Sequence, residues 1–229
     1  MAEIVGEYIG VDIRRHKPTG FDSDSKLQTP CPFRSGPCIK LKKGQAPVCS
    51  VRSPKDDSIW IVCEHRLCSS TPKNDPLTDY QVQVLYMIAD TVAPTWREHA
   101  RVAVQREGKV RRSPGENSPD DSSADYLMVF LEKDSDELHP RFKPIILEMQ
   151  GGGETSNTKS MSDHVKSWER DPTVNLKSPM PISSIETNAW RRQQEQFLIK
   201  GSVATRSNGK LVFVVGGRLF DKLMANLTS

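Results

Sequence analysis

The sequence predicts a mixed fold of the α/β type, in which helices pack on a mixed sheet. Apolar residues recur at three- and four-residue intervals over 79–104, which is typical of a helix, here divided by Pro94. Two short apolar runs, 126–131 and 144–150, flank a charged loop that contains proline, a pattern typical of an antiparallel strand pair. Further helices are expected at 161–168, 185–201 and 218–227, with another strand at 211–215.

Length and composition indicate the size and class of the protein. A chain of 229 residues accommodates one large core with a small appendage, and we expect an N-terminal segment over 1–75 and a core domain over 76–229. With 36% apolar and 27% charged residues, and no apolar run near the roughly 20 residues of a membrane span, the chain is expected to be soluble. Its first residues lack the features of a signal peptide, so we expect a cytoplasmic location.

The two predicted strands bring acidic residues to one end of the pair. In an antiparallel pair the start of the first strand lies beside the end of the second, so Asp125 and Glu148 are expected to be neighbours. Side chains alternate along a strand, which places Glu148 and Gln150 on one face and Met149 on the other. Three glycines follow at 151–153 and leave room for the backbone of another chain. Carboxylates in this arrangement are typical of a Mg²⁺ site for phosphodiester hydrolysis.

Each residue of this group has a chemical role in that interpretation. Asp125 and Glu148, with the carbonyl oxygen of Met149, supply oxygen ligands for Mg²⁺. Gln150 stands where many nucleases of this type carry a lysine, and its amide can orient water or contact phosphate but brings no positive charge. Glu98, on the expected helix, is a further catalytic candidate. The alternative is that Asp125 caps a strand and that Glu148 and Glu98 are solvated, because Asp…Glu-x-Gln is a weak pattern.

Five cysteines lie between residues 31 and 68, in a segment too polar to bury a core of its own. In a cytoplasmic chain they argue against disulfides and leave metal ligation or buried thiols. Four thiolates around one iron or zinc ion would hold the segment together. The candidate ligands are Cys31, Cys38, Cys49 and Cys63. Cys68 is left over and His65 is a competing ligand, while buried reduced cysteines are the alternative because the spacing is irregular.

Two stretches carry side chains that suit nucleic acid. Residues 26–55 hold seven Lys or Arg and no Asp or Glu, and such a block suits a phosphate backbone. The expected helix at 185–201 presents Asn and Arg side chains, which read base edges or phosphates. The candidate DNA contacts are Lys40, Lys42, Arg66, Asn188, Arg191 and Arg192. A solvated basic loop and an ordinary polar helix face are the alternatives.

Three stretches resemble the NotI-like type II restriction endonucleases, members of the PD-(D/E)XK nuclease superfamily. The first is Cys-Pro-Phe…Cys-x-Lys…Cys-Ser-Val…Cys over 31–63, the second is Glu-Met-Gln-Gly-Gly-Gly-Glu-Thr over 148–155, and the third is Asn-Ala-Trp-Arg-Arg-Gln-Gln-Glu-Gln-Phe over 188–197. The order helix, strand pair, helix, strand, helix also resembles the PD-(D/E)XK core. The expected architecture is therefore such a core with an N-terminal four-cysteine segment.

The resemblance implies a Mg²⁺-dependent homodimer that cuts double-stranded DNA at GC-rich palindromes and holds structural iron on four cysteines. Asp125, Glu148 and Gln150 match the family's catalytic positions, and the four candidate cysteines match its metal ligands. The expected activity is that of a site-specific endonuclease. The alternative is a non-catalytic, metal-stabilised regulator that reads a DNA site, although such a protein has no reason to bring two carboxylates next to phosphate.

Overall fold

The computed structural model describes residues 4–14, 29–42, 44–69, 75–110, 122–150, 158–171 and 197–227. The chain divides into two compact units, each assembled from separated segments. Unit 1 comprises Met1–Leu67, Gln150–Trp190 and Val215–Ser229, and unit 2 comprises Cys68–Met149 and Arg191–Val214. Unit 2 begins close to the expected boundary at residue 75, whereas two later segments join the N-terminal one instead of the core domain.

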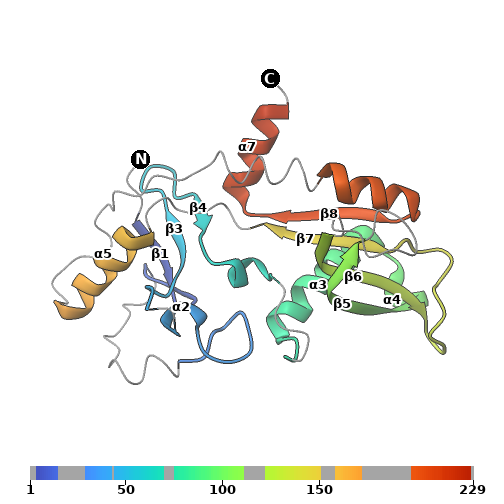
Figure 1. The fold of residues 1–229 in the computed structure, drawn as a ribbon, viewed down its shortest axis with the longest axis horizontal. Coiled ribbons are helices and arrows are strands. Elements are labelled where there is room, and N and C mark those ends of the chain that lie inside the picture. Colours follow the sequence, from blue (N-terminus) through green and yellow to red (C-terminus); the bar gives the residue numbers. More distant parts are fainter. Residues whose placement is uncertain are drawn as a thin grey trace. The chain divides into compact units, whose positions relative to one another are not determined.

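Unit 1 is built on a small antiparallel sheet with the strand order β2-β1-β3-β4, of which Figure 1 labels β1, β3 and β4. The strands are β1 (Ile4–Tyr8), β2 (Val11–Asp12), β3 (Val48–Arg52) and β4 (Ile59–Ile61). The helices are α2 (Ile39–Lys42), the 3-10 helix η1 (Glu64–Leu67), α5 (Thr158–Arg170) and α7 (Gly217–Leu227). Strand β3 is buried along its whole length because strands flank it on both sides.

The core of unit 1 joins residues that are far apart in the sequence. The ring of Tyr8 on β1 meets Trp168 on α5 edge to face, with the ring centroids 5.9 Å apart. Met161 and Val165, on the same face of α5, belong to the same buried cluster. The expected helix at 161–168 is therefore present, and it supplies apolar surface that the polar cysteine segment lacks.

Unit 2 contains a mixed sheet with the strand order β5-β6-β7-β8. Its strands are β5 (Ala100–Val110), β6 (Ser122–Glu132), β7 (Ile145–Gln150) and β8 (Lys210–Val215). The predicted antiparallel pair is confirmed, because β6 and β7 pair with Tyr126 opposite Leu147. The main-chain N–H of Lys210 donates to Pro144 O at 2.8 Å, so β8 starts beside the start of β7 and runs parallel to it (Figure 1).

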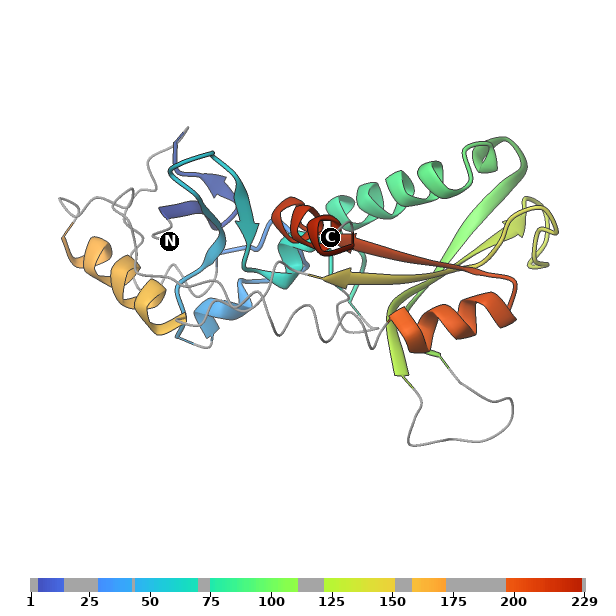
Figure 2. The same ribbon diagram turned by 90° about the horizontal axis from the view of Figure 1, so that it is seen from above.

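Helices cover both faces of this sheet, as Figure 2 shows. One face packs against α3 (Asp79–Val92) and α4 (Trp96–His99), whose Leu85 and Trp96 share a core with β6 and β7. The other face packs against the helix of residues 197–206, through Ala204 and Ile146. None of the helices in the described part of the chain is long and apolar enough to cross a membrane.

The helix predicted over 79–104 is correct only as far as His99. Thr78 starts α3 with a capping box, in which Thr78 and Gln81 satisfy each other's main-chain N–H groups. Residues 100–110 instead form β5, which pairs with β6 from Ala100 opposite Glu132 to Val110 opposite Ser122. The prediction was wrong there because the apolar residues of 100–104 fit helical and strand periodicity equally, and only the pairing with β6 distinguishes the two.

The helix predicted over 185–201 falls largely outside the described residues. Its described part, 197–201, is helical, but the helix continues to 206, so Gly201 does not end it. Leu198 is 77% exposed, whereas Lys200 is 1% exposed. Lys200 pairs with Glu148 in the sheet, and this pair decides which face of the helix turns inward.

Asp12, at the end of β2, forms an ion-pair network with two arginines. Its carboxylate accepts from Arg14 Nη2 at 2.8 Å and lies 3.5 Å from Arg52 Nη2. The side-chain hydrogen bond from Arg14 holds the pKa of Asp12 at about 2, below its ordinary value of 3.8. Because the folded-state pKa is lowered, this stabilisation is present above about pH 4 and is lost as the pH falls towards about 2.

Asp12→Asn is expected to remove this acid-sensitive contribution. The free energy of unfolding at pH 7 should fall because the ion pairs are lost. The loss should not exceed about 1 kcal/mol, because solvent screens these pairs. The decline of stability between about pH 4 and pH 2 should also become shallower. Urea unfolding of both proteins across this pH range measures both effects. An identical pH dependence in the two proteins would contradict the network.

Candidate active site and cysteine cavity

Asp125 and Glu148 lie opposite each other at one end of the β6–β7 pair. The register that pairs Tyr126 with Leu147 brings Asp125 beside Glu148 when it is continued by one residue. Asp125 Oδ2 accepts the main-chain N–H of Met149 at 2.7 Å, and the main-chain N–H of Asp125 donates to the Glu148 carboxylate. Main-chain N–H groups of the two strands thus hold both carboxylates in place. Asp125 and Glu148 are neighbours, as the sequence predicted from the antiparallel strand pair.

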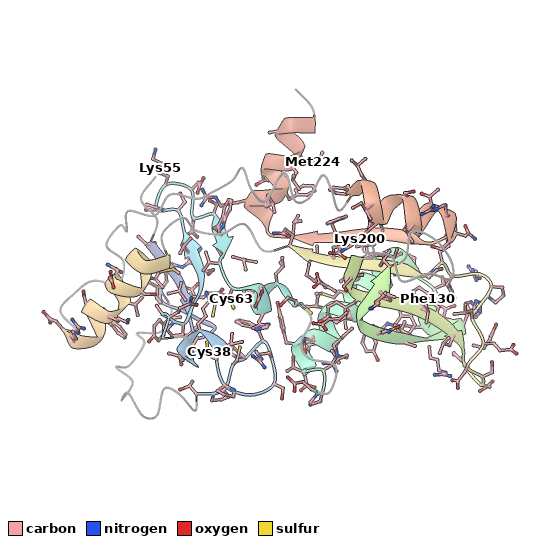
Figure 3. All side chains as sticks on the ribbon, in the orientation of Figure 1. Cys38, Lys55, Cys63, Phe130, Lys200 and Met224 are labelled. Atoms are coloured by element: carbon pink, nitrogen blue, oxygen red, sulfur yellow. The ribbon has the colours of Figure 1, made fainter. Side chains whose placement is uncertain are left out.

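Lys200 contributes a buried positive charge to this pair. Its Nζ donates to Glu148 Oε1 at 2.5 Å and to the main-chain oxygen of Ser123 at 2.7 Å. Lys200 comes from the helix of residues 197–206, which covers the face of the sheet that carries Glu148 (Figure 3). The sequence does not point to Lys200, because a lysine in a helix is normally a surface residue and no local pattern indicates its partner in β7.

Burial is the largest influence on Glu148, whose side chain is only 13% exposed. Burial raises the pKa of its carboxyl group, the hydrogen bond and charge of Lys200 lower it, and the charge of Asp125 raises it again. Asp125, Glu148 and Lys200 together carry one net negative charge when ionised. Mg²⁺ sites commonly use one or two carboxylates, so this donor set fits a divalent cation of that type.

Gln150 and Glu98 occupy different places in relation to this pair. Gln150 is the last residue of β7, two positions after Glu148, and is half-buried. Glu98 lies in α4, beside the pairing of Ala100 with Glu132, at the opposite end of β6 from Asp125. The intervening strand is about 23 Å long, and the Glu98 side chain is 73% exposed. The structure therefore does not bring Glu98 to the carboxylates.

The expected DNA contacts that the structure describes are engaged within unit 1. Lys40 Nζ donates to Val48 O at 2.6 Å and to Val62 O at 3.2 Å. Arg66 Nε lies 3.0 Å from the Glu7 carboxylate. Lys42 belongs to α2, but its side chain lies outside the described residues. Asn188, Arg191 and Arg192 also lie outside the described residues.

The four candidate cysteines line one small cavity in unit 1, of about 10 Å³, which is about the least space that holds one water molecule. Two local structures create it. The loop closed by the main-chain bond from Cys31 N–H to Gly36 O brings Cys31 and Cys38 together, and the bond from Cys63 N–H to Cys49 O joins the other two. Figure 3 shows sulfur atoms gathered near Cys38 and Cys63.

His65 and Cys68, the two other ligand candidates, differ in position. His65 also lines the cavity. Cys68 belongs to unit 2, where its Sγ lies 4.0 Å from the hydroxyl of Tyr126 and 4.0 Å from the main-chain oxygen of Gln81. Cys68 therefore does not line the cavity, and all five cysteines are free thiols.

Burial and hydrogen bonds act on the cavity thiols in opposite directions. Burial raises the pKa of Cys49 to about 12, and the nearby Cys63 also raises it. The main-chain N–H of Gly10 lies 3.3 Å from Cys49 Sγ and lowers that pKa, as does the Lys40 ammonium. Burial also raises the pKa of Cys31, while the main-chain N–H groups of Phe33 and Arg34 lower it. These donors favour the thiolate form that a bound cation requires.

The donor set of this cavity suits iron or zinc, which soft thiolate ligands prefer. Within the described ranges, however, no group of three or more His, Cys, Asp or Glu side chains is arranged to hold a metal ion. The sequence matches no protein-family model and no curated protein.

Gly10 allows the close packing beside this cavity. Its φ is 73°, and a Cβ atom would lie 2.4 Å from Pro32 Cγ. Gly36 also has a left-handed backbone, with φ of 82°, but a Cβ atom there would meet nothing within 4 Å. Gly10→Ala should therefore suffer both backbone strain and overlap, whereas Gly36→Ala should suffer strain alone.

Gly10→Ala is expected to lower the free energy of unfolding by about 2–4 kcal/mol, and Gly36→Ala by about 1–2 kcal/mol. Urea unfolding of the two variants beside the unchanged protein measures the difference. Equal losses would show that Pro32 does not pack against Gly10 in solution.

Proposed function

We propose that this protein is a Mg²⁺-dependent endonuclease that hydrolyses phosphodiester bonds of double-stranded DNA. One observation carries the proposal: two carboxylates meet at one end of a strand pair, with a buried lysine on one of them. Mg²⁺ sites that act on phosphate use such oxygen ligands. When bound, Mg²⁺ would polarise the scissile phosphate and lower the pKa of the attacking water.

The chain's own residues have separate tasks in this proposal. Asp125 and Glu148 hold the cation, and the carbonyl oxygen of Met149 is a further ligand candidate. The main-chain N–H of Met149 orients Asp125, and the main-chain N–H of Asp125 orients Glu148. Because strand backbones do this positioning, the ligands are preorganised before substrate arrives. Gln150 orients water or contacts phosphate.

A purely structural ion pair explains this arrangement less well. Lys200 and Glu148 alone would satisfy one another, and a second carboxylate adds repulsion, since the charge of Asp125 raises the pKa of Glu148. A group of like charges close together costs stability, and such groups are common at functional sites. This cost favours a role in binding a cation.

The finer assignment is a site-specific enzyme of the NotI-like type II restriction endonuclease group, with a PD-(D/E)XK core. Support comes from the sequence motifs and from the antiparallel order β5-β6-β7, the parallel β8 and helices on both faces of the sheet. In this proposal the protein acts as a homodimer on a GC-rich palindrome, because two-fold protein symmetry matches two-fold DNA symmetry.

We also propose that the four cysteines of the cavity bind a structural iron or zinc ion. The support is the shared cavity, the N–H groups that act on Cys31 and Cys49, and the Lys40 ammonium, which also lowers the pKa of Cys49. Cys31, Cys38, Cys49 and Cys63 would hold the ion as thiolates. A bound ion would tie these four residues together and so stabilise unit 1.

Plasmid nicking tests the nuclease proposal. The unchanged protein should nick or linearise supercoiled DNA only with Mg²⁺, and Asp125→Asn and Glu148→Gln should each lower the rate about 100-fold or more, because each loses a metal ligand. Gel electrophoresis of long GC-rich DNA then reports whether the cuts are discrete.

Glu98→Gln is the matched control, because it removes a carboxylate from α4, which lies beside the opposite end of β6 from Asp125. It should cut at the rate of the unchanged protein. Cleavage that survives both Asp125→Asn and Glu148→Gln would contradict the assigned site. A DNA mobility shift without Mg²⁺-dependent cleavage would instead favour a DNA-binding regulator.

The cysteine proposal makes a separate prediction about metal content. Cys49→Ser should lose most of the bound iron or zinc, because a hydroxyl is a poor ligand for these ions. Cys68→Ser should retain it, because Cys68 contacts Tyr126 and not the cavity. Elemental analysis of the purified proteins measures both, and equal metal content in the two variants would refute the assigned ligand set.

A further inference from the structure

We propose that Lys200 is a positioning residue, which orients the Glu148 carboxylate for metal binding from the helix of residues 197–206. This inference rests on the proposed function of the carboxylate pair. Nothing in the sequence motifs includes Lys200, because the residue that follows Glu148 by two positions is Gln150. The positive charge of the site is thus supplied by a helix, and not by β6 or β7, the two strands that carry the acidic residues.

The contacts of Lys200 hold its ammonium in one place. Nζ donates to Glu148 Oε1 at 2.5 Å and to Ser123 O at 2.7 Å. The second bond matters because Ser123 belongs to β6, two residues before Asp125. Lys200 therefore joins the Glu148 side chain on β7 to the backbone of the strand that carries Asp125. With the N–H of Asp125 on the same carboxylate, Glu148 is held from two directions.

The burial of Lys200 indicates that it positions Glu148 and does not contact the substrate directly. The Lys200 side chain is 2% exposed, so its ammonium does not reach a phosphate in this conformation and acts through Glu148. Burying an ammonium costs several kcal/mol, and well-packed apolar residues often replace buried ion pairs without loss of stability. A lysine in this place is therefore better explained by what it does to Glu148 than by packing.

Groups that orient metal ligands commonly change metal affinity or activity by about 10–100-fold when they are removed. Lys200→Met keeps the length of the side chain and removes both its charge and its hydrogen bonds. Lys200→Gln removes the charge and shortens the side chain, but keeps an N–H donor for Glu148 or Ser123. Lys210→Met is the matched control, because Lys210 Nζ also donates to a main-chain oxygen in unit 2, Val92 O at 3.0 Å.

The experiment is a titration of each protein with Mn²⁺ in a calorimeter, without DNA. Mn²⁺ prefers oxygen ligands, so it reports the carboxylate pair in preference to the cysteine cavity. Glu148→Gln should abolish the heat signal, which identifies the site. The Mn²⁺ dissociation constant should rise about 10–100-fold in Lys200→Met, less in Lys200→Gln, and stay unchanged in Lys210→Met.

Thermal melting checks that each variant is folded, and if Lys200→Met does not fold, Lys200→Gln carries the test. Mn²⁺ affinity within twofold of the unchanged protein in the folded Lys200 variants would overturn the inference, even if they melt at lower temperature. No Mn²⁺ binding to the unchanged protein would overturn it together with the proposed function. Normal Mn²⁺ binding that depends on Lys200, without any DNA cleavage, would support the inference and contradict only the nuclease.

Discussion

The ammonium of Lys200, buried between Ser123 O and the Glu148 carboxylate, allows two like charges to stay side by side at the end of a strand pair. The face of β6 and β7 that points away from Lys200 is apolar and packs on α3. This end of the sheet therefore has one apolar face and one face with charged side chains. Burial and the nearby Asp125 both act against ionisation of Glu148, so a positive charge is needed on this face. The helix of residues 197–206 supplies it by turning Lys200 inward, and this orientation leaves Leu198 exposed.

The two candidate metal environments differ in chemistry as well as in location. The carboxylate pair in unit 2 offers hard oxygen ligands, of the kind that Mg²⁺ prefers, while the cavity in unit 1 offers soft sulfur ligands, of the kind that iron and zinc prefer. Each has a buried or half-buried lysine within reach, Lys200 in one and Lys40 in the other. In the proposals above, these ligand types would direct Mg²⁺ to the carboxylate pair and iron or zinc to the cavity, and would assign a catalytic role to the first and a structural role to the second.

The basic block at 26–55 is partly structural. Lys40 donates to two main-chain oxygens beside the cysteine cavity, and buried Arg52 pairs with Asp12 and Asp57. Outside the block, Arg66 pairs with Glu7 and stacks over the ring of Phe33. These groups hold unit 1 together, so the count of basic residues in the sequence overstates the charge available to a phosphate backbone. The block still belongs to a chain with a formal net charge of +3.

Local patterns in the sequence determined the capping box that starts α3, the β6–β7 pair with its adjacent carboxylates, and the amphipathic helix α5, because these depend on neighbours along the chain or on strand alternation. Only the tertiary structure decided that residues 100–110 form a strand and that Lys200 turns inward, since both depend on partners in β6 and β7. The same holds for the cysteines. The sequence identified them as candidate metal ligands, but only the tertiary structure groups four of them around one cavity and places Cys68 elsewhere. That cavity forms because segments distant in the sequence meet, and the burial of apolar side chains between them supplies the free energy.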